Sequence, residues 1–296
     1  MWSTVLLKRS IDLDSLEIFR AVATEGGVIR AARKLNRVQS NVTTRIKRME
    51  ERLGRPLFRK QGRGLVLSAE GELLLSYAQR LFRLAEEAEH ELRSGRPMGL
   101  LRIGSLESTA GSRLAPILSR YHREHPGVVV ELLMGTTGAL LQRIAQFEIE
   151  AAFVSEPFTA DGLSTMKVFE EELVLITARG QPPVRAASDL AGMTVVAFAA
   201  GCSYRKRLED WLGASSLLPA RTLELASYQA MIACVAAGTG FAVVPRSLLL
   251  ALKSAREVRQ HELPARVRHS HTHLVWKGEP SGALSRLQEM LSETAT

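Results

Sequence analysis

The strongest constraint on the fold is a basic amphipathic segment near the N-terminus. Residues 30–63 contain twelve lysines and arginines against two glutamates, a charge of +10, while the whole chain carries +8. The basicity is therefore concentrated in this segment. Within it, Val42, Ile46 and Met49 are spaced by four and three residues, which places them on one face of a helix. This pattern predicts a helix with one buried face and an exposed face suited to a polyanion.

A shorter helical segment, residues 28–35, is predicted before this helix, and residues 36–38 join the two. Two helices connected in this way, the second polar and basic at its N-terminal end, predict a helix-turn-helix. Short hydrogen-bonding side chains suit base edges, and arginines suit phosphates. The predicted DNA contacts are Arg30, Arg33, Arg37, Gln39, Ser40, Asn41, Thr43, Thr44, Arg45, Lys47, Arg48, Arg59 and Arg63. For the charge alone, a solvated basic face on an ordinary domain is the alternative.

A β-hairpin is predicted directly after the basic helix. Two short apolar arms, residues 57–60 and 65–67, flank Gly62, Arg63 and Gly64. The tip would carry Arg63 into a minor groove or along the phosphates. The segment is therefore predicted to be a winged helix-turn-helix.

A long helix without proline is predicted over residues 71–93, with Ser68 as a candidate N-cap. Apolar residues repeat along it with spacings of four and three, the pattern of a coiled-coil seam. The predicted dimerisation residues are Leu74, Ala78, Leu81, Ala85, Ala88 and Leu92. The alternative is that this seam packs on the protein's own core.

A Ser-Gly-Arg-Pro break at residues 94–97 ends the long helix and indicates a domain boundary. Beyond it, predicted strands such as 128–134 and 151–155 alternate with helices, which predicts an α/β fold on mostly parallel sheets. Ligands in such folds bind at the carboxyl ends of the strands, near helix N-termini.

Four loops at such positions supply hydroxyls and backbone N–H groups that suit an anionic or polar small molecule. The predicted effector contacts are Ser105, Leu106, Glu107, Ser108, Thr136, Thr137, Ser155, Cys202, Ser203, Tyr204 and Arg205. Two alternatives stay open: Ser108 caps a helix, and Arg205 forms a surface ion pair with Glu209.

Several other classes of protein are not expected. The chain has no Gly-x-Ser-x-Gly motif or phosphate-binding glycine loop, so neither an enzyme nor a cofactor is predicted. His269, His271 and His273 alternate along a predicted strand, where they could bind zinc or respond to pH, but no metal site is predicted. No apolar run approaches the length of a bilayer span, and residues 1–10 do not form a signal-peptide pattern. With only two cysteines, a cytoplasmic location without a membrane partner is expected.

These motifs resemble the LysR-type transcriptional regulators. The resemblance covers the predicted first helix at residues 13–23, the recognition helix and its Gly54-Arg55-Pro56 exit, and the wing, and it continues to the C-terminus. It departs from the family pattern at Gly27, Ser40 and Thr44, where the family commonly has serine, proline and arginine.

The resemblance implies three parts: a winged helix-turn-helix over residues 1–67, a linker and dimerisation helix over 68–95, and an effector-binding domain over 96–296. The last would have two lobes like a periplasmic binding protein, lobe I at about 100–164 and 270–296 and lobe II at about 165–269. The implied function is a sequence-specific regulator, a homodimer or homotetramer on promoter double-stranded DNA, modulated by a small effector between the lobes. An effector-independent architectural protein, or an enzyme with a fused DNA-binding domain, is the alternative.

Overall fold

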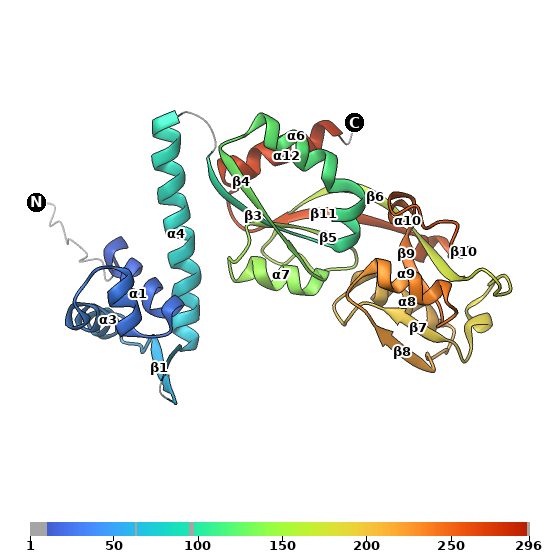
Figure 1. Cartoon of the computed structure of the whole chain (residues 1–296), viewed down its shortest axis with the longest axis horizontal. Coiled ribbons are helices and arrows are strands. Elements are labelled where there is room, and N and C mark those ends of the chain that lie inside the picture. The colour runs from blue at the N-terminus through green and yellow to red at the C-terminus, as the bar shows by residue number, and fades with distance from the viewer. Residues whose placement is uncertain (1–10, 63, 95–97, 295–296) are drawn as a thin grey trace, which may run out of the picture. The chain divides into compact units, whose positions relative to one another are not determined.

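The computed structural model describes residues 11–62, 64–94 and 98–294, which form two compact units divided between Glu89 and His90 (Figure 1). Arg63 and the expected domain limits at residues 1, 95, 96 and 296 lie outside the described residues. Across the described part of the chain, no helix combines the length and apolarity needed for a membrane span.

The N-terminal unit contains three helices, a hairpin and a long helix. Its elements are α1 (Leu13–Glu25), α2 (Val28–Lys34), α3 (Gln39–Leu53), β1 (Phe58–Gln61), β2 (Gly64–Leu67) and α4 (Ala69–Ser94), and the division between the units falls within α4. The predicted winged helix-turn-helix is thus present, with α3 as its second helix. The apolar stripe Val42, Ile46 and Met49 is buried against Phe19 and other residues of α1 and α2. This packing leaves the polar side of α3 on the surface.

Glu50 connects α3 to the hairpin. Its Oε1 accepts hydrogen bonds from the backbone N–H groups of Leu57 at 2.8 Å and Phe58 at 3.2 Å. These two residues begin the first arm of the antiparallel β1–β2 pair, in which Phe58 lies opposite Leu67. The wing is therefore attached to α3 by a side chain from α3 itself.

The beginning of α4 belongs to the N-terminal unit. The Ser68 hydroxyl accepts a hydrogen bond from the Gly71 N–H at 3.0 Å, so the predicted cap is present. Leu74 and Ala78 are 9% and 0% exposed in the core of this unit. The prediction that these two belong to a dimer seam is therefore wrong, because their own domain covers them. The exposed apolar residues of α4 include Leu73, Leu81, Leu84 and Leu92.

The C-terminal unit alternates strands and helices, as predicted. Its first part comprises β3 (Gly99–Ser105), α5 (Glu107–Thr109), the π-helical turn η1 (Ala110–Leu114), α6 (Ala115–Glu124), β4 (Val128–Met134), α7 (Thr137–Ala145), β5 (Ala151–Ser155) and β6 (Ser164–Ala178). Its second part comprises η2 (Ala187–Leu190), β7 (Thr194–Ala197), α8 (Ser203–Ala214), β8 (Arg221–Glu224), α9 (Tyr228–Ala236), β9 (Ala242–Pro245), α10 (Arg246–Ala251), β10 (Val258–Glu262), α11 (Ala265–Arg268), β11 (His269–Trp276) and α12 (Gly282–Thr294).

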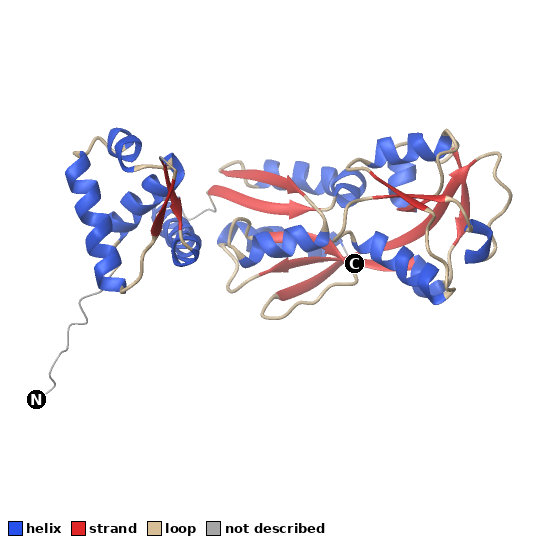
Figure 2. Ribbon diagram, turned by 90° about the horizontal axis from the view of Figure 1, so that it is seen from below, coloured by secondary structure: helices blue, strands red, loops and turns tan. Residues whose placement is uncertain are grey.

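Two lobes share one long sheet of order β10-β6-β11-β5-β3-β4, with β9 paired to β6. In lobe I, β3 pairs in parallel with β4 and β5, and β11 pairs antiparallel to β5. Helices α6 and α12 cover one face of this sheet and α7 covers the other (Figures 1 and 2). Lobe II has its own core around the second half of β6, β9, α8 and α9, and the parallel pair β7–β8.

The lobes are joined by β6 and β11. Val168, in the first half of β6, packs in the core of lobe I, whereas Leu173 packs in the core of lobe II. The chain therefore crosses between lobes inside β6, a few residues after the boundary expected at 165. Each lobe therefore has a separate core, and the two strands β6 and β11 connect them.

Candidate DNA interface and ligand cleft

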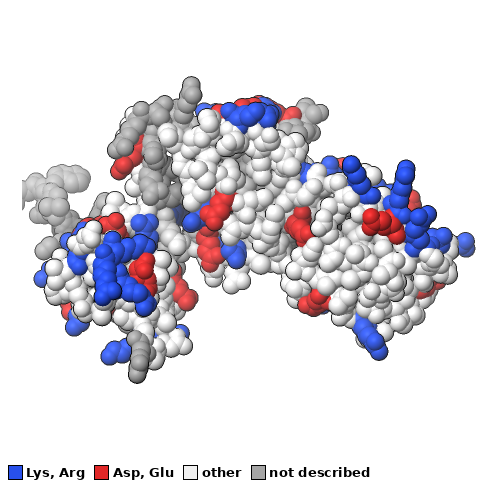
Figure 3. Space-filling model, in the orientation of Figure 1, with Lys and Arg blue, Asp and Glu red and all other residues white. Residues whose placement is uncertain are grey.

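The surface of α3 presents the polar residues predicted to contact DNA. Gln39, Ser40, Asn41, Thr44 and Lys47 are exposed, and so is Arg48 one turn after Thr44. Thr43 is half-buried, and its hydroxyl donates to the backbone carbonyl of Gln39 at 3.0 Å. Lys and Arg side chains gather on a face of this unit (Figure 3). The helix thus offers hydrogen-bonding groups on a rigid, positively charged surface.

Two of the predicted cationic contacts have internal partners. Arg37 Nη2 lies 2.5 Å from Asp14 Oδ1, and Arg45 Nη2 lies 3.1 Å from Asp14 Oδ2. The hydrogen bond to Asp14 raises the pKa of Arg37. Asp14 on α1 therefore binds both the turn before α3, through Arg37, and the middle of α3, through Arg45. In this structure both arginines position the helices instead of extending freely from the surface.

The other predicted cations differ in how strongly they are held. The guanidinium of Arg30 donates to the Glu25 carbonyl, and Arg59 Nε donates to the Leu67 carbonyl at 3.4 Å. Arg33, Lys47 and Arg48 have no ion-pair partner within the described parts of the chain. These three are the cations most readily available to a phosphate backbone.

A cleft of about 460 Å³ opens between the lobes of the C-terminal unit. Its walls come from the ends of β3, β4, β7 and β8 and from the beginnings of α5, α8 and α9. Seven of the predicted effector contacts line it: Leu106, Glu107, Ser108, Thr136, Cys202, Ser203 and Tyr204. The rule that ligands bind at the carboxyl ends of strands therefore locates this cleft.

The remaining four predicted contacts do not line the cleft. The Ser105 side chain is buried and donates to the Leu106 carbonyl at 2.9 Å. Arg205 forms ion pairs with Glu209 at 2.7 Å and Glu224 at 2.6 Å, so the alternative of an ion pair with Glu209 holds. Thr137 and Ser155 belong to a buried hydroxyl network described below. Thr137 and Arg205 instead line a neighbouring pocket of about 300 Å³ that shares Cys202 and Ser203 with the cleft, so their role toward an effector stays a prediction.

Sequence reasoning missed several residues of the cleft. Met134 and Phe198 lie at or just beyond the ends of β4 and β7, so extending the strand-end rule by one residue would have found them. Glu224, Leu225 and Tyr228 lie at or after the end of β8, a four-residue strand with an exposed, polar sequence that gave no strand signal. The helical segment after β3 begins at Glu107, and Ser108 makes no cap hydrogen bond there.

Burial raises the pKa of several groups in the cleft. The Glu107 carboxylate accepts the Tyr228 N–H at 3.1 Å, but desolvation raises the pKa of Glu107. Burial also raises the pKa of the Cys202 thiol and raises that of Tyr204 to about 12. The buried hydroxyls of Ser108 and Ser155 lie next to that of Tyr204 and lower its pKa in part. The cleft therefore combines neutral donors with one partly buried carboxylate.

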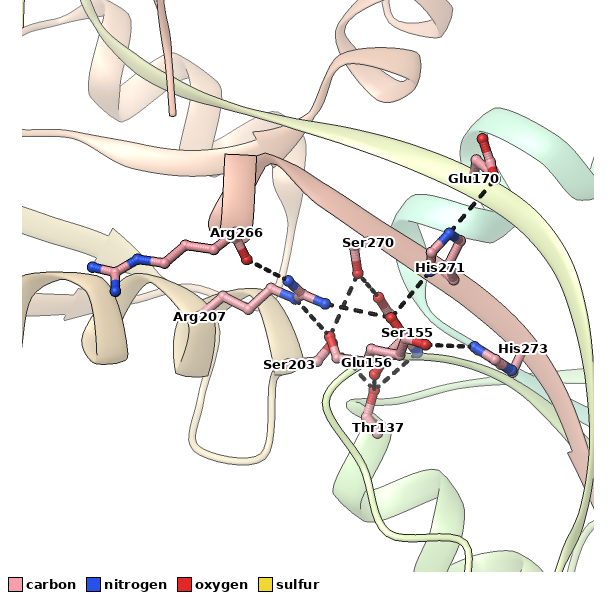
Figure 4. A network of polar contacts seen from close by, with 10 residues as sticks. All are labelled: Thr137, Ser155, Glu156, Glu170, Ser203, Arg207, Arg266, Ser270, His271 and His273. Carbon is pink, nitrogen blue, oxygen red and sulfur yellow. Dashed lines mark hydrogen bonds and ion pairs between the residues drawn. The ribbon is translucent and has the colours of Figure 1, made fainter. Parts of the chain in front are cut away.

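A polar network joins the lobes next to the cleft (Figure 4). Thr137 Oγ1 donates to the Ser155 carbonyl at 3.3 Å, lies 3.4 Å from Ser203 Oγ of lobe II, and accepts the Ser155 N–H. The Ser155 hydroxyl lies 2.8 Å from that of Ser270 on β11. These hydroxyls join β5 and β11 to the starts of α7 and α8, and Thr137 also lines the pocket beside the cleft.

Glu156 is the charged centre of this network. Its carboxylate lies 2.9 Å from His273 Nε2, 3.2 Å from His271 Nδ1 and 3.5 Å from Arg207 Nη2 of α8. Burial opposes ionisation, but hydrogen bonds from His273 and His271 outweigh it, so the pKa of Glu156 is lowered. Two of the three alternating histidines, His271 and His273, thus hydrogen-bond to Glu156. Over the described residues, no group of three or more His, Cys, Asp or Glu side chains could hold a metal ion.

Family models match both units. The model described as a bacterial regulatory helix-turn-helix protein of the lysR family matches residues 13–72, and that of the LysR substrate binding domain matches residues 94–296. Among curated relatives, the HTH-type transcriptional regulator GltR of Bacillus subtilis (strain 168) is 35% identical over 254 residues, covering 86% of each chain. SoxR of Arthrobacter sp. (strain TE1826) is 34% identical over 255 residues, 86% of each chain.

Solved structures share the fold. A full-length OxyR variant from Pseudomonas aeruginosa aligns with a TM-score of 0.72 at 19% identity, over 96% of this chain and 94% of that one. Full-length CbnR in complex with its target DNA aligns with a TM-score of 0.66 at 21% identity, over 96% and 100%.

A winged helix-turn-helix followed by a two-lobed α/β module with a cleft defines a DNA-binding protein that carries a ligand-binding domain. With both family models matched, the chain belongs to the LysR family of transcriptional regulators. It is a regulator and not an enzyme, because its relatives and both families are regulators.

Proposed function

We propose that this protein is a homodimer or homotetramer that recognises a promoter through α3 and the wing, and that a small molecule in the cleft alters that recognition. The observation that carries the proposal is the exposed polar face of α3 in the same chain as a two-lobed cleft. No cofactor is needed for such a mechanism. A cytoplasmic location accompanies it, because the bacterial chromosome lies in that compartment.

In this proposal the DNA contacts divide into two kinds. Gln39 and its neighbours Ser40, Asn41, Thr43 and Thr44 read base edges, because short amide and hydroxyl groups match their donors and acceptors. Arg33, Lys47 and Arg48 neutralise phosphates, together with Arg30, Arg59 and Arg63. Arg37 and Arg45 contribute by orienting α3, since Asp14 holds them.

The second half of α4 would provide the dimer contact. Leu81, Leu84, Ala88 and Leu92 are exposed at spacings of three and four residues, and Leu73 continues this face toward the N-terminus. Spacings of three and four place them along one stripe that a second copy of the helix can cover. Two copies related by a two-fold axis would present two recognition helices to a palindromic site.

The response to a ligand would be a population shift. Because the lobes have separate cores and share two crossing strands, a change in their separation would leave each core intact. A molecule that binds one separation more tightly shifts the equilibrium toward it. One structure that shares this fold, LysG from Corynebacterium glutamicum, is described with a bound effector Arg.

The proposal is tested by sequencing genomic DNA fragments that the purified full-length protein retains. A regulator enriches a small set of fragments that share an interrupted palindrome, and footprinting maps its contacts to both half-sites. An even distribution over the genome would refute promoter recognition and favour an architectural protein.

A further inference from the structure

We infer that the molecule bound in the cleft is a hydrophobic cation, an amine or guanidine on an apolar body, that pairs with Glu107. This inference rests on the proposed function and adds the chemical class of the ligand. It differs from the anionic or polar ligand expected from the hydroxyl-rich loops. It follows from three features of the cleft: its charge, the occupancy of its helix terminus, and its apolar walls.

The charged side chains of the cleft wall are acidic. Glu107 and Glu224 line it, and no lysine or arginine does so within the described residues. A neighbouring pocket of about 300 Å³ shares Cys202 and Ser203 with the cleft and is lined by two cations. Both are already held, Arg205 by Glu209, Glu224 and the Phe198 carbonyl, and Lys206 by Asp210. Glu107 has no ion-pair partner in the described part of the chain. An entering carboxylate would meet this negative charge without a compensating cation, whereas an ammonium would supply the missing partner.

The natural anion position of the cleft is already filled. The N-terminus of α9 opens into the cleft, and helix N-termini attract anions through their free N–H groups. Here the Tyr228 N–H of lobe II donates to Glu107 Oε1 of lobe I at 3.1 Å. A ligand anion would have to displace the protein's own carboxylate from this helix. A ligand cation can bind Glu107 where it lies.

The rest of the cleft suits an apolar body. Leu106, Met134 and Leu225 line it, together with a tilted aromatic pair, Phe198 and Tyr228, whose ring centroids are 4.6 Å apart. A cation near such rings gains electrostatic stabilisation from their faces. A volume of about 460 Å³ lies within the range of small-molecule sites.

The test uses three probes on one carbon skeleton: phenylpropylamine, phenylpropanol and phenylpropanoate. Their dissociation constants for the full-length protein are measured by calorimetry near neutral pH. We expect the amine to bind at least about tenfold more tightly than the propanoate, with the alcohol between them.

Two substitutions separate the role of Glu107 from net charge. Glu107→Gln keeps an oxygen that can accept the Tyr228 N–H, and it should abolish the preference for the amine. Glu148→Gln removes the same charge from an exposed pair with Arg143 outside the cleft, and it should keep the preference. If Glu107→Gln does not fold, the comparison of the three probes on the unaltered protein decides by itself.

The inference is overturned if the propanoate binds as tightly as the amine, if no probe binds, or if the preference survives Glu107→Gln. A protein that selects promoter fragments but prefers the propanoate would keep the proposed function and lose the charge assignment. A protein that prefers the amine but retains DNA without selectivity would keep the charge assignment and lose the proposed function.

Discussion

Replacing Glu50 by alanine should detach the wing from the recognition helix. Glu50 Oε1 accepts the N–H groups of Leu57 and Phe58, at 2.8 and 3.2 Å, and Leu57 is 1% exposed. Hydrogen bonds to a charged acceptor contribute about 1.5–3 kcal/mol each. Because Glu50 is only half-buried and water can replace part of the interaction, we expect the pair to contribute about 2 kcal/mol together.

Urea unfolding of the full-length protein, followed by circular dichroism, measures this loss. With a denaturant dependence of about 2 kcal/mol per molar urea, the midpoint of the transition that includes α3 should fall by about 1 M. Promoter affinity should fall as well, since the wing no longer has a fixed position. Gln at position 50 should retain part of both, because its amide oxygen can accept one N–H.

The neighbouring residue provides a matched control. Glu51→Ala removes the same charge from the same helix turn, but Glu51 is exposed and makes no hydrogen bond to the described residues of the wing. It should leave the midpoint unchanged and, by removing a negative charge from a DNA-facing surface, leave promoter binding equal or stronger. The reasoning is refuted if Glu50→Ala and Glu51→Ala lower the midpoint equally.

The other predictions concern the DNA surface, the dimer helix and the polar network around Glu156. Gln39→Ala should relax sequence selectivity with little change in the salt dependence of DNA binding. Arg48→Ala should weaken binding to all DNA fragments and reduce the slope of affinity against salt by about 1 in binding titrations. Equal effects of the two substitutions on selectivity would contradict the assignment. Leu84→Glu should convert the oligomer to a smaller species in sedimentation experiments without loss of helix content, and an unchanged mass would exclude that face of α4. Because the pKa of Glu156 is lowered in the folded protein, its contribution to stability is present above the ordinary carboxyl range, near pH 4, and is lost as the pH falls through its folded value. Glu156→Gln should therefore flatten the acid side of the stability profile measured by urea unfolding at several pH values, and an unaltered slope would argue against the His271–Glu156–His273 interaction.

Local patterns predicted the recognition helix because periodicity and burial agree there. The spacing of Val42, Ile46 and Met49 reflects the turn of the helix itself, and the helix spans Gln39–Leu53 as expected. The same holds for β4 and β5, whose apolar runs match their observed bounds. The strands β8 and β10 were not predicted, because their own residues give a weak strand pattern and pairing with neighbouring strands stabilises them.

The residues that each side chain contacts could not be predicted in the same way. A heptad spacing in α4 predicts an apolar stripe, but it does not say whether the protein's own core or a second copy covers it, and Leu74 and Ala78 proved to lie in the core. Arg205 and Ser155 likewise offer polar groups in strand-end loops, yet Glu224 and Ser270, distant in sequence, already satisfy them.

The sequence alone therefore specified the class of fold, the recognition helix with its wing, and the loops that surround the cleft, because these follow from short-range periodicity and strand order. Which side chains face the cleft, and with what charge, depended on contacts between residues far apart in the chain. Glu107 illustrates the difference: its position after β3 follows from the sequence, but its hydrogen bond to α9 and its lack of a cationic partner among the described residues arise only when the two lobes pack together.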